Sequence, residues 1–587
     1  MMRYFAIFLC ICVLTVLSLA TSPATAQTSR QDKPNVIIVI TDDQGYGDLG
    51  CHGNTQIRTP NIDTFYDEST RFTRFYVSPV CSPTRASVMT GRYNYRTGVV
   101  GTYGAKGMME SSEITIAECL RDAGYATGLF GKWHLGDHWP MRPTDQGFQE
   151  VLCHQGGSIG HWSIPTRNYP PHNTYFDPVL QRNNSWVIST GYCTDIFFDA
   201  AIDFIEANRS QPFFAYIATN APHIPEQIDE QYVEPYREMG LDNFTARIYG
   251  MCENIDDNMG RLLGTLDELS LRENTILIFM TDNGPQLYER IGGENNRPRY
   301  SAGMRGAKTT VWENGLRVPY FIRWPARWQG DRDISRIAAH IDIMPTLLDI
   351  CGIDLPDDRV IDGVSLLPLL DNRTDTEAQW PERQLFIQGH HANTPTLNRN
   401  IAVVGQRYKL VQPRAYNGKY VGNEPFMLFD LEKDPGEHQD LAADEPDLCQ
   451  RMKRAYEQWF EDVSSTRGYH PVRIPIGTAH QERITLLQQT WRSFDNDTQG
   501  RPGAWVVSIE KSGTYQFTAQ FLQTSQSGTV WLKAGNQERS MDVTPMAMSC
   551  TFEPIQLESG DCEIESYFIS NGKRKKMDYV HIKEIYE

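Results

Sequence analysis

Residues 35–43 read Asn-Val-Ile-Ile-Val-Ile-Thr-Asp-Asp, a run of apolar, mostly β-branched residues that ends in two carboxylates. Such a run without alternation is typical of a strand buried on both faces of a parallel sheet. Similar runs occur at residues 125–130, 212–218 and 275–280. Helical patterns lie between these runs, at residues 114–123, 197–207 and 248–269. The alternation predicts an α/β fold in which a mainly parallel sheet is flanked by helices.

Two of the runs end in matching acidic motifs. Asp42 and Asp43 follow a threonine at the end of the first run, and Asp282 and Asn283 follow a threonine at the end of the last. Three carboxylates and an amide form an all-oxygen ligand set, which selects Ca²⁺ or Mg²⁺ over zinc. A single aspartate at such a place is equally compatible with a turn or a helix cap. The repeated motif favours a metal site, and the cation would also relieve repulsion between the carboxylates.

The other two runs lead into basic residues. Lys132 and His134 follow the run at 125–130, and an extended segment would point both side chains to the same side. Lysine suits an oxyanion, and His134 can accept a proton. His223 lies between Pro222 and Pro225 after the run at 212–218 and is placed to donate a proton to a leaving group. Ligands bind beyond the carboxyl ends of parallel strands, so we expect all these residues on one rim.

Residues 80–87 read Val-Cys-Ser-Pro-Thr-Arg-Ala-Ser and place a thiol beside a cation. Pro83 fixes the backbone between Cys81 and Arg85, and the following residues read as the start of a helix. A guanidinium and a helix N-terminus are both suited to an oxyanion. The alternative is a buried structural cysteine beside a surface arginine.

The motif Cys81-Ser-Pro-Thr-Arg85 resembles the signature of the type I sulfatases, which belong to the alkaline phosphatase superfamily. The resemblance covers roughly residues 34–460. It implies that a separate maturation enzyme, which generates formylglycine, oxidises Cys81 to Cα-formylglycine. The hydrate of this aldehyde is the nucleophile in the family, and its second hydroxyl lets the sulfate be expelled again.

The resemblance also implies a role for each candidate residue. The catalytic residues are Cys81, Arg85, His134 and His223. Lys132 and Lys308, the latter in a matching Gly-Met-Arg-Gly-Ala-Lys segment, bind the sulfate group. The metal is Ca²⁺ in preference to Mg²⁺, and its ligands are Asp42, Asp43, Asp282, Asn283 and an oxygen of the modified Cys81.

The resemblance also implies a domain organisation. An alkaline-phosphatase-like catalytic domain is expected over residues 33–375, and a small C-terminal sheet subdomain over 376–465. Beyond it, short period-two segments separated by Gly and Ser turns predict a β-sandwich over residues 480–587 that does not carry the chemistry. We expect Trp505 and Trp531 in its core rather than stacked on sugars. Cys550 and Cys562 are candidates for a disulfide in an oxidising compartment.

The N-terminus predicts export. Arg3, an apolar stretch and an Ala24-Thr-Ala26 motif form a signal peptide over residues 1–26, with an uncleaved anchor as the alternative. No later stretch reaches the ~20 apolar residues of a membrane span. The mature chain is expected in the periplasm or outside the cell, or in a lysosome or the secretory pathway of a eukaryote. A net charge of −18 excludes a basic nucleic-acid-binding face.

The sequence therefore predicts an exported, calcium-dependent sulfatase that acts on a sulfated saccharide, and on small aryl sulfates in assays. Two alternatives stay open. One is a phosphonate or phosphate monoester hydrolase on the same fold, and the other is a non-catalytic glycan-binding protein. The sugar, the position of its sulfate, exo or endo action and the oligomeric state are also open at this point.

Overall fold

The computed structural model describes residues 33–159, 174–287, 299–372, 380–390, 392–413, 425–493, 503–521 and 526–585. The expected signal peptide at 1–26 lies outside these residues. Among the helices within them, none is both long enough and apolar enough to span a bilayer.

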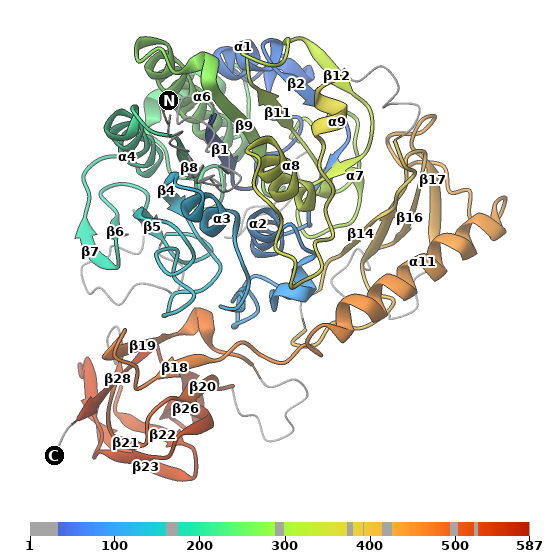
Figure 1. The fold of residues 1–587 in the computed structure, drawn as a ribbon. Coiled ribbons are helices and arrows are strands. Elements are labelled where there is room, and N and C mark those ends of the chain that lie inside the picture. Colours follow the sequence, from blue (N-terminus) through green and yellow to red (C-terminus); the bar gives the residue numbers. More distant parts are fainter. Residues whose placement is uncertain are drawn as a thin grey trace, which may run out of the picture.

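A ten-stranded sheet forms the centre of the catalytic domain, in the order β12-β2-β11-β9-β1-β8-β4-β5-β6-β7 (Figure 1). The four predicted strands are β1 (Asn35–Thr41), β4 (Ala126–Lys132), β8 (Phe213–Ala218) and β9 (Thr275–Thr281). They are neighbours in the order β9-β1-β8-β4, they run parallel, and all but one of their residues are buried. The predicted parallel α/β sheet is therefore confirmed, and the four strands end at one edge. The sheet is completed by β2 (Thr70–Phe72), β5 (Glu150–His154), β6 (Val179–Arg182), β7 (Ser185–Ile188), β11 (Tyr320–Arg323) and β12 (Arg332–Ile334).

Helices cover both faces of the sheet, and each face has its own apolar cluster. One face packs against α1 (Pro60–Asp67), α4 (Cys193–Asn208) and α6 (Asn243–Glu268), and the other against α2 (Cys81–Thr90), α3 (Ile116–Asp122) and α8 (Ile343–Ile350) (Figure 1). The predicted helices exist, but α6 begins five residues earlier than expected because Asp242 caps it by accepting hydrogen bonds from the amides of Phe244 and Thr245. Further helices are α5 (Glu230–Glu238), α7 (Glu313–Leu316) and α9 (Leu367–Leu370).

The small C-terminal subdomain has the expected antiparallel sheet with a helix against it. Its strands are β14 (Leu385–Gln388), β15 (Ile401–Val404), β16 (Tyr408–Gln412) and β17 (Met427–Asp430), and its helix is α11 (Pro446–Ser465). A buried ion pair joins it to the catalytic domain, because Lys409 Nζ lies 2.9 Å from Glu313 Oε1 and 2.8 Å from Glu437 Oε1. A three-stranded sheet is formed by β10 (Arg317–Val318), β3 (Phe75–Tyr76) and β13 (Ala338–Ala339). It contributes side chains both to the apolar cluster of the subdomain and to a cluster of the central sheet.

The C-terminal segment is a sandwich of two mainly antiparallel sheets, as predicted (Figure 1). One sheet contains β18 (Ile474–Ile476), β20 (Trp505–Ile509), β22 (Gly528–Ala534), β23 (Gln537–Val543), β26 (Gly560–Ser570) and β27 (Lys573–Lys576). The other contains β19 (Arg483–Leu487), β21 (Gly513–Gln520), β24 (Ser549–Thr551), β25 (Ile555–Leu557) and β28 (Tyr579–Ile585). Trp505 is buried in the core, whereas Trp531 is half-buried and stacks on Tyr567 with ring centroids 4.6 Å apart.

Two expectations about the sandwich need correction. Cys550 and Cys562 are both free thiols, because they lie on strands of different sheets and no disulfide joins them. The sandwich is also not a detached module. Its apolar cluster includes Ala105, Met108 and Met141 of the catalytic domain.

Candidate active site

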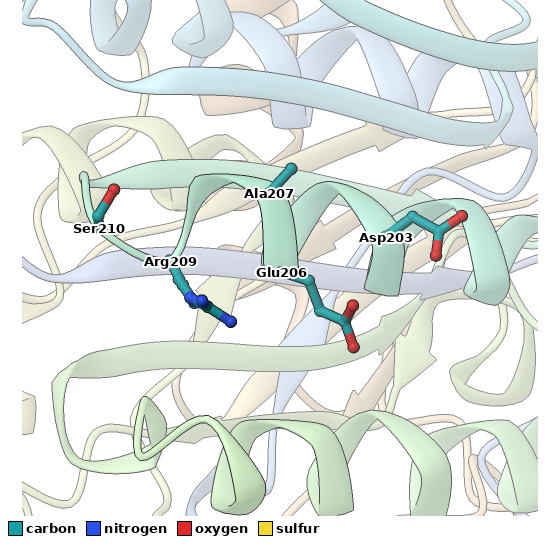
Figure 2. A pocket seen from close by; sticks show the side chains of 5 residues that line it. All are labelled: Asp203, Glu206, Ala207, Arg209 and Ser210. Atoms are coloured by element: carbon teal, nitrogen blue, oxygen red, sulfur yellow. The ribbon is translucent and has the colours of Figure 1, made fainter.

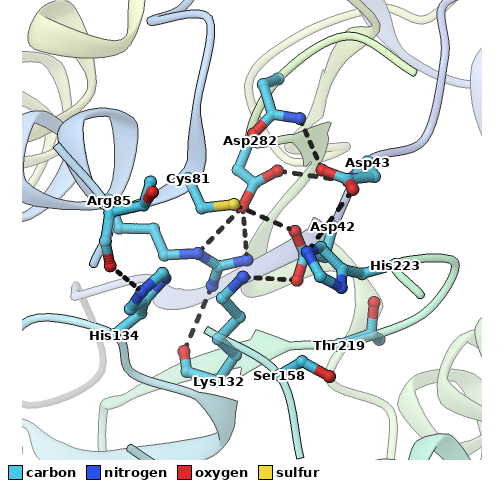
Figure 3. A network of polar contacts seen from close by, with 12 residues as sticks. Asp42, Asp43, Cys81, Arg85, Lys132, His134, Ser158, Thr219, His223 and Asp282 are labelled. Atoms are coloured by element: carbon cyan, nitrogen blue, oxygen red, sulfur yellow. Dashed lines mark hydrogen bonds and ion pairs between the residues drawn. The ribbon is translucent and has the colours of Figure 1, made fainter. Parts of the chain in front are cut away.

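The ends of β1 and β9 bring the acidic residues together (Figure 3). Thr41 pairs with Thr281 in the parallel register, so Asp42 and Asp282 leave the sheet side by side. The chain turns at Asp43, whose φ is +65°, and its amide donates to Asp282 Oδ1 at 3.3 Å. All three carboxylates are buried.

Cys81 lies among these carboxylates at the first residue of α2. Its Sγ donates to Asp42 Oδ1 at 3.5 Å, and one ligand atom each of Asp42, Asp43, Cys81 and His223 lies within 4.8 Å of the others. Burial, and next the Asp42 carboxylate, raise the pKa of the thiol well above its ordinary value. An unmodified Cys81 is therefore a neutral thiol, which is a poor nucleophile.

Each of the three carboxylates has its own cation. Lys132 Nζ lies 2.5 Å from Asp42 Oδ2, Lys308 Nζ lies 2.6 Å from Asp43 Oδ1, and Arg85 Nη2 lies 2.8 Å from Asp282 Oδ2. Three negative and three positive groups therefore balance inside a buried site. Both predicted sulfate-binding residues and the predicted catalytic arginine thus lie at the acidic cluster. Figure 3 shows Lys132 and Arg85 there.

The surroundings shift the pKa values of Asp43 and Asp282 in opposite directions. Burial raises the pKa of Asp43, but Lys308 and His223 outweigh it and hold that pKa below its usual range. Burial, and next the Asp42 carboxylate, raise the pKa of Asp282 to about 6 despite Arg85. A divalent cation at this place would favour the ionised form of Asp282.

The donor set fits a hard cation. Asn283 Nδ2 donates to Asp43 Oδ1 at 2.7 Å and to the carbonyl oxygen of Gly284 at 2.9 Å, which fixes the orientation of the amide. Its Oδ1 is buried and receives no hydrogen bond from another described residue. A buried acceptor without a donor is costly, and a Ca²⁺ or Mg²⁺ ion is the partner that an amide oxygen beside three carboxylates would take.

The two candidate histidines differ in position. His223 lies beside the acidic cluster, with Nε2 3.7 Å from Asp43 Oδ2 and Nδ1 2.7 Å from the carbonyl oxygen of Ile224. Burial, and next Lys308, lower its pKa to about 3. Because a carbonyl only accepts, Nδ1 carries the proton and Nε2 is the unprotonated nitrogen.

His134 lies beside Arg85 instead (Figure 3). Its φ is +61°, so the chain turns after Lys132, and the expectation that the two side chains share one side of an extended segment is wrong. Its Nε2 lies 2.8 Å from the carbonyl oxygen of Thr102, so this nitrogen is the donor and Nδ1 the acceptor. Nδ1 is buried and has no hydrogen-bond partner among the described residues. Burial, and next Lys132, hold the pKa of His134 well below its ordinary value.

Sequence reasoning missed a second layer that positions the acidic loop. Arg299 Nη2 lies 2.9 Å from Asp48 Oδ2 and donates to the carbonyl oxygen of Asp43 at 3.3 Å. Asp48 Oδ2 also accepts from the amide of Gly45 at 2.6 Å. Neither residue belongs to a motif, so only their contact in the fold reveals them.

Gly131 explains how Lys132 reaches Asp42. It pairs with Ala218 on β8, has a φ of +118°, and a Cβ at this position would lie 1.8 Å from the Ala218 carbonyl oxygen. Only glycine allows this approach of the two strands immediately before Lys132.

A surface hollow at the C-terminal end of α4 is not part of this site. Asp203, Glu206, Ala207, Arg209 and Ser210 line it (Figure 2). The chain enters β8 directly after this hollow, so the hollow lies at the opposite edge of the sheet from the strand ends that carry Asp42 and His223.

Comparison with known families agrees with this geometry. The family model described as sulfatase matches residues 34–353, more than half of the 587-residue chain. The chain belongs to the sulfatase family. A second model, described as N-sulphoglucosamine sulphohydrolase, C-terminal, matches residues 306–462. The β-sandwich of this sulfatase lies beyond both.

The relatives of this sulfatase act on different sulfate esters, as their names indicate. Steryl-sulfatase of Mus musculus is 29% identical and matches 73% of this chain and 81% of its own length. N-acetylgalactosamine-6-O-sulfatase of Bacteroides thetaiotaomicron is 28% identical over 73% of this chain and 93% of its own. The crystal structure of Ps i-CgsB in complex with k-i-k-neocarrahexaose is 27% identical, covers 73% of this chain and 92% of its own, and has a TM-score of 0.62. The two relatives named as sulfatases are sulfuric ester hydrolases, and so is this enzyme.

Proposed function

We propose that this sulfatase is exported and hydrolyses sulfate esters of a carbohydrate, with Ca²⁺ and a formylglycine at position 81. The observation that carries the proposal is the position of Cys81 at the N-terminus of α2, within 4.8 Å of ligand atoms of Asp42, Asp43 and His223. When present, the formylglycine hydrate supplies the nucleophile and Ca²⁺ supplies charge neutralisation for the sulfate oxygens.

Asp42, Asp43, Asp282 and the free Oδ1 of Asn283 would hold the metal, together with an oxygen of the modified residue 81. Lys132 and Lys308 lie at this ligand set and would bind the sulfate oxygens once the metal competes for Asp42 and Asp43. Arg85 holds Asp282 through two donors, Nε at 3.0 Å and Nη2 at 2.8 Å. The helix N-terminus adds a further anion-binding element.

Two imidazoles are available for proton transfer. His134 presents an unprotonated Nδ1 without a hydrogen-bond partner among the described residues, which suits the acceptance of a proton from a hydroxyl at residue 81. His223 lies on the Asp43 side of the site, and we assign it the donation of a proton to the departing alcohol oxygen. Its Nε2 carries no proton in the free site, so this role requires that Nε2 takes up a proton when the anionic substrate binds, because a nearby negative charge favours the imidazolium. Hydrolysis then leaves the alcohol and inorganic sulfate as products.

A carbohydrate substrate is supported by the relatives. The bacterial relative is named for N-acetylgalactosamine 6-O-sulfate, and Ps i-CgsB was solved with a neocarrahexaose. Export is supported by the signal-like N-terminus. The phosphonate or phosphate monoester alternative receives less support, because only one metal-binding cluster of His, Cys, Asp and Glu occurs within the described ranges.

The test is hydrolysis by the protein coexpressed with a formylglycine-generating enzyme. Intact mass should show the exchange of the Cys81 CH₂SH group for an aldehyde. The matured protein should hydrolyse 4-nitrophenyl sulfate in the presence of Ca²⁺ and lose this activity with a chelator. A preference for 4-nitrophenyl phosphate or a phenylphosphonate ester over the sulfate would contradict the proposal, as would full activity without maturation.

A further inference from the structure

A cavity of about 500 Å³ lies between the catalytic domain and the β-sandwich. Its walls come from five parts of the chain. The catalytic domain contributes residues within 137–142, Gln155 and residues within 181–186, and the sandwich contributes residues within 481–487 and His581. The size is in the range of small-molecule sites. The family models end at residues 353 and 462, so the sandwich side of this cavity lies outside the residues that they match.

On the sandwich side, the paired strands β19 and β28 form the wall of the cavity. Arg483, Thr485 and Leu487 are alternate residues of β19 and therefore share one face of the strand. His581 lies opposite Thr485 in the antiparallel register with β28, and its Nδ1 is 2.9 Å from Thr485 Oγ1. The intervening residues Ile484 and Leu486 belong to the core of the sandwich.

The catalytic domain contributes a wall that continues from the active-site edge of the sheet. Lys132 pairs with His154 in the parallel register of β4 and β5, and Gln155 follows directly. Trp186 comes from the β6–β7 hairpin at the end of the same sheet, where it pairs with Gln181. The cavity therefore lies on the strand-end side of the sheet, one strand beyond Lys132.

Specific contacts hold the two walls in place. His138 Nε2 lies 3.0 Å from the carbonyl oxygen of Thr485, and the amide of Trp139 donates to Gln481 Oε1 at 2.9 Å. Trp139 also stacks on His480 with ring centroids 4.5 Å apart. A cavity between walls fixed in this way is preorganised for a ligand.

The lining is suited to an anionic sugar. Gln155 is 8% exposed, and its Nε2 donor has no acceptor among the described residues. Arg483 is exposed and forms no ion pair with another described residue. Trp186 is 42% exposed and offers an indole ring, the kind of surface on which sugar rings stack.

The carboxylate in the lining contacts a histidine. Asp137 Oδ1 lies 2.5 Å from His138 Nδ1, and His138 also contacts the Thr485 carbonyl through its other nitrogen. Burial lowers the pKa of His138, but Asp137 outweighs it and holds the pKa above its ordinary value. The Asp137 carboxylate therefore lies against the His138 imidazole and does not stand alone in the cavity.

We propose that this interdomain cavity binds a second acidic or sulfated sugar unit of a polymeric substrate, distant from the unit whose ester is hydrolysed at Cys81. This inference rests on the proposed function and specifies its substrate as an oligomer or polymer. It also gives the β-sandwich a role in substrate recognition without a part in the chemistry.

The test compares Trp186→Ala and Arg483→Ala with two matched controls in the matured enzyme. Ile188→Ala removes an 81% exposed apolar side chain from the same strand as Trp186, and Lys573→Ala removes an exposed cation from another edge of the sandwich. The substrates are a panel of carrageenan and chondroitin sulfate hexasaccharides, and 4-nitrophenyl sulfate as the small reference. Binding of the same hexasaccharides to Cys81→Ala protein is measured by calorimetry.

We expect the ratio of kcat/KM on the preferred hexasaccharide to kcat/KM on 4-nitrophenyl sulfate to fall at least tenfold in both cavity variants, mainly through KM. The controls should stay within twofold of wild type. An unchanged ratio on every hexasaccharide, or an equal loss on both substrate sizes, would overturn the inference. If the matured enzyme hydrolyses no sulfate ester, the proposed function fails separately. In that case hexasaccharide binding to the Cys81→Ala protein tests the cavity. Weaker binding on adding Arg483→Ala supports the inference, and unchanged binding overturns it.

Discussion

Lys132 Nζ lies 2.5 Å from Asp42 Oδ2, and both side chains are fully buried. Lys132 ends β4 and Asp42 directly follows β1, two strands with only β8 between them, and Gly131 allows the close approach of β4 to β8. Removing one partner of such a pair leaves an uncompensated buried charge, which typically costs about 3–5 kcal/mol. The pair therefore links the stability of the catalytic domain to its metal content, because a cation can replace the lysine as partner of Asp42.

Lys132→Met is expected to destabilise the protein by about 3–5 kcal/mol when a chelator is present. Ca²⁺ should recover part of this loss because it neutralises Asp42, whereas hydrolysis of 4-nitrophenyl sulfate should remain impaired. Denaturant unfolding with chelator and with Ca²⁺ measures both effects. Lys453→Met, on the surface of α11, is the matched control. It should show neither the loss of stability in chelator nor the loss of hydrolysis. Equal stability of Lys132→Met and wild type in chelator would show that the Lys132–Asp42 pair does not stabilise the metal-free protein.

Cys81→Ala should abolish turnover while leaving the fold intact, because no other described residue takes the place of the nucleophile. The loss on removing a nucleophile is on the order of 10⁶-fold in kcat. The measurement is kcat on 4-nitrophenyl sulfate together with Tm. Cys449→Ala changes another thiol, on α11, and should keep full activity. Activity of Cys81→Ala within tenfold of wild type would rule out the mechanism.

Asp282→Asn should weaken Ca²⁺ binding by about tenfold or more, which corresponds to about 1.4 kcal/mol or more. The substitution removes a charged oxygen ligand and leaves Arg85 without its anionic partner. Since a ligand that binds the folded state stabilises it, the rise in Tm on adding Ca²⁺ should also shrink. Calorimetric titration and thermal unfolding check this prediction. Unchanged affinity would exclude Asp282 from the ligand set.

Glu437→Gln tests the buried cluster that joins the small subdomain to the catalytic domain. Burial, opposed by Lys409 and assisted by Glu313, raises the pKa of Glu437 to about 7 from an ordinary 4.5. A carboxyl whose pKa is raised on folding stabilises the protein fully below pH 4.5 and loses this contribution as the pH rises through 7. Wild type should therefore lose stability relative to Glu437→Gln between pH 4.5 and 8.

The measurement is the Tm difference between the two proteins across that pH range. Gln439→Ala changes no ionisable group at an exposed position of the same segment and should give a difference that does not change with pH. A constant difference for Glu437→Gln as well would show that this carboxyl does not titrate in the window.

Truncation after residue 473 should lower both Tm and turnover of 4-nitrophenyl sulfate, although the sandwich carries none of the candidate catalytic residues. The deletion would expose Ala105, Met108 and Met141, and it would remove the Gln489 carbonyl oxygen that accepts from the Ala105 amide at 3.0 Å. Ala105 lies in the same loop as Thr102, which orients His134. A truncated protein with wild-type Tm and kcat would show that the loop holds its conformation alone.

The sequence predicted those parts of the site that depend only on short stretches of the chain. The apolar runs and the acidic motifs after them are visible in short windows, and the parallel sheet brings their ends together by a general rule. The turn at His134 was not predictable, because the positive φ occurs at a histidine and not at a glycine or asparagine, and the Thr102 carbonyl that its side chain contacts is 32 residues away in the chain. Arg299 and the docking of the sandwich were not predictable either, because they depend on contacts between segments far apart in the chain.

The sandwich contacts have a consequence for how such enzymes are recombined. Gln489 binds the loop of Ala105, and Gln481 and Thr485 bind the segment of His138 and Trp139. A chimera that exchanges this C-terminal unit with that of another protein would keep the linker but lose the matched surface on the catalytic side. The two units should therefore be transplanted as a pair.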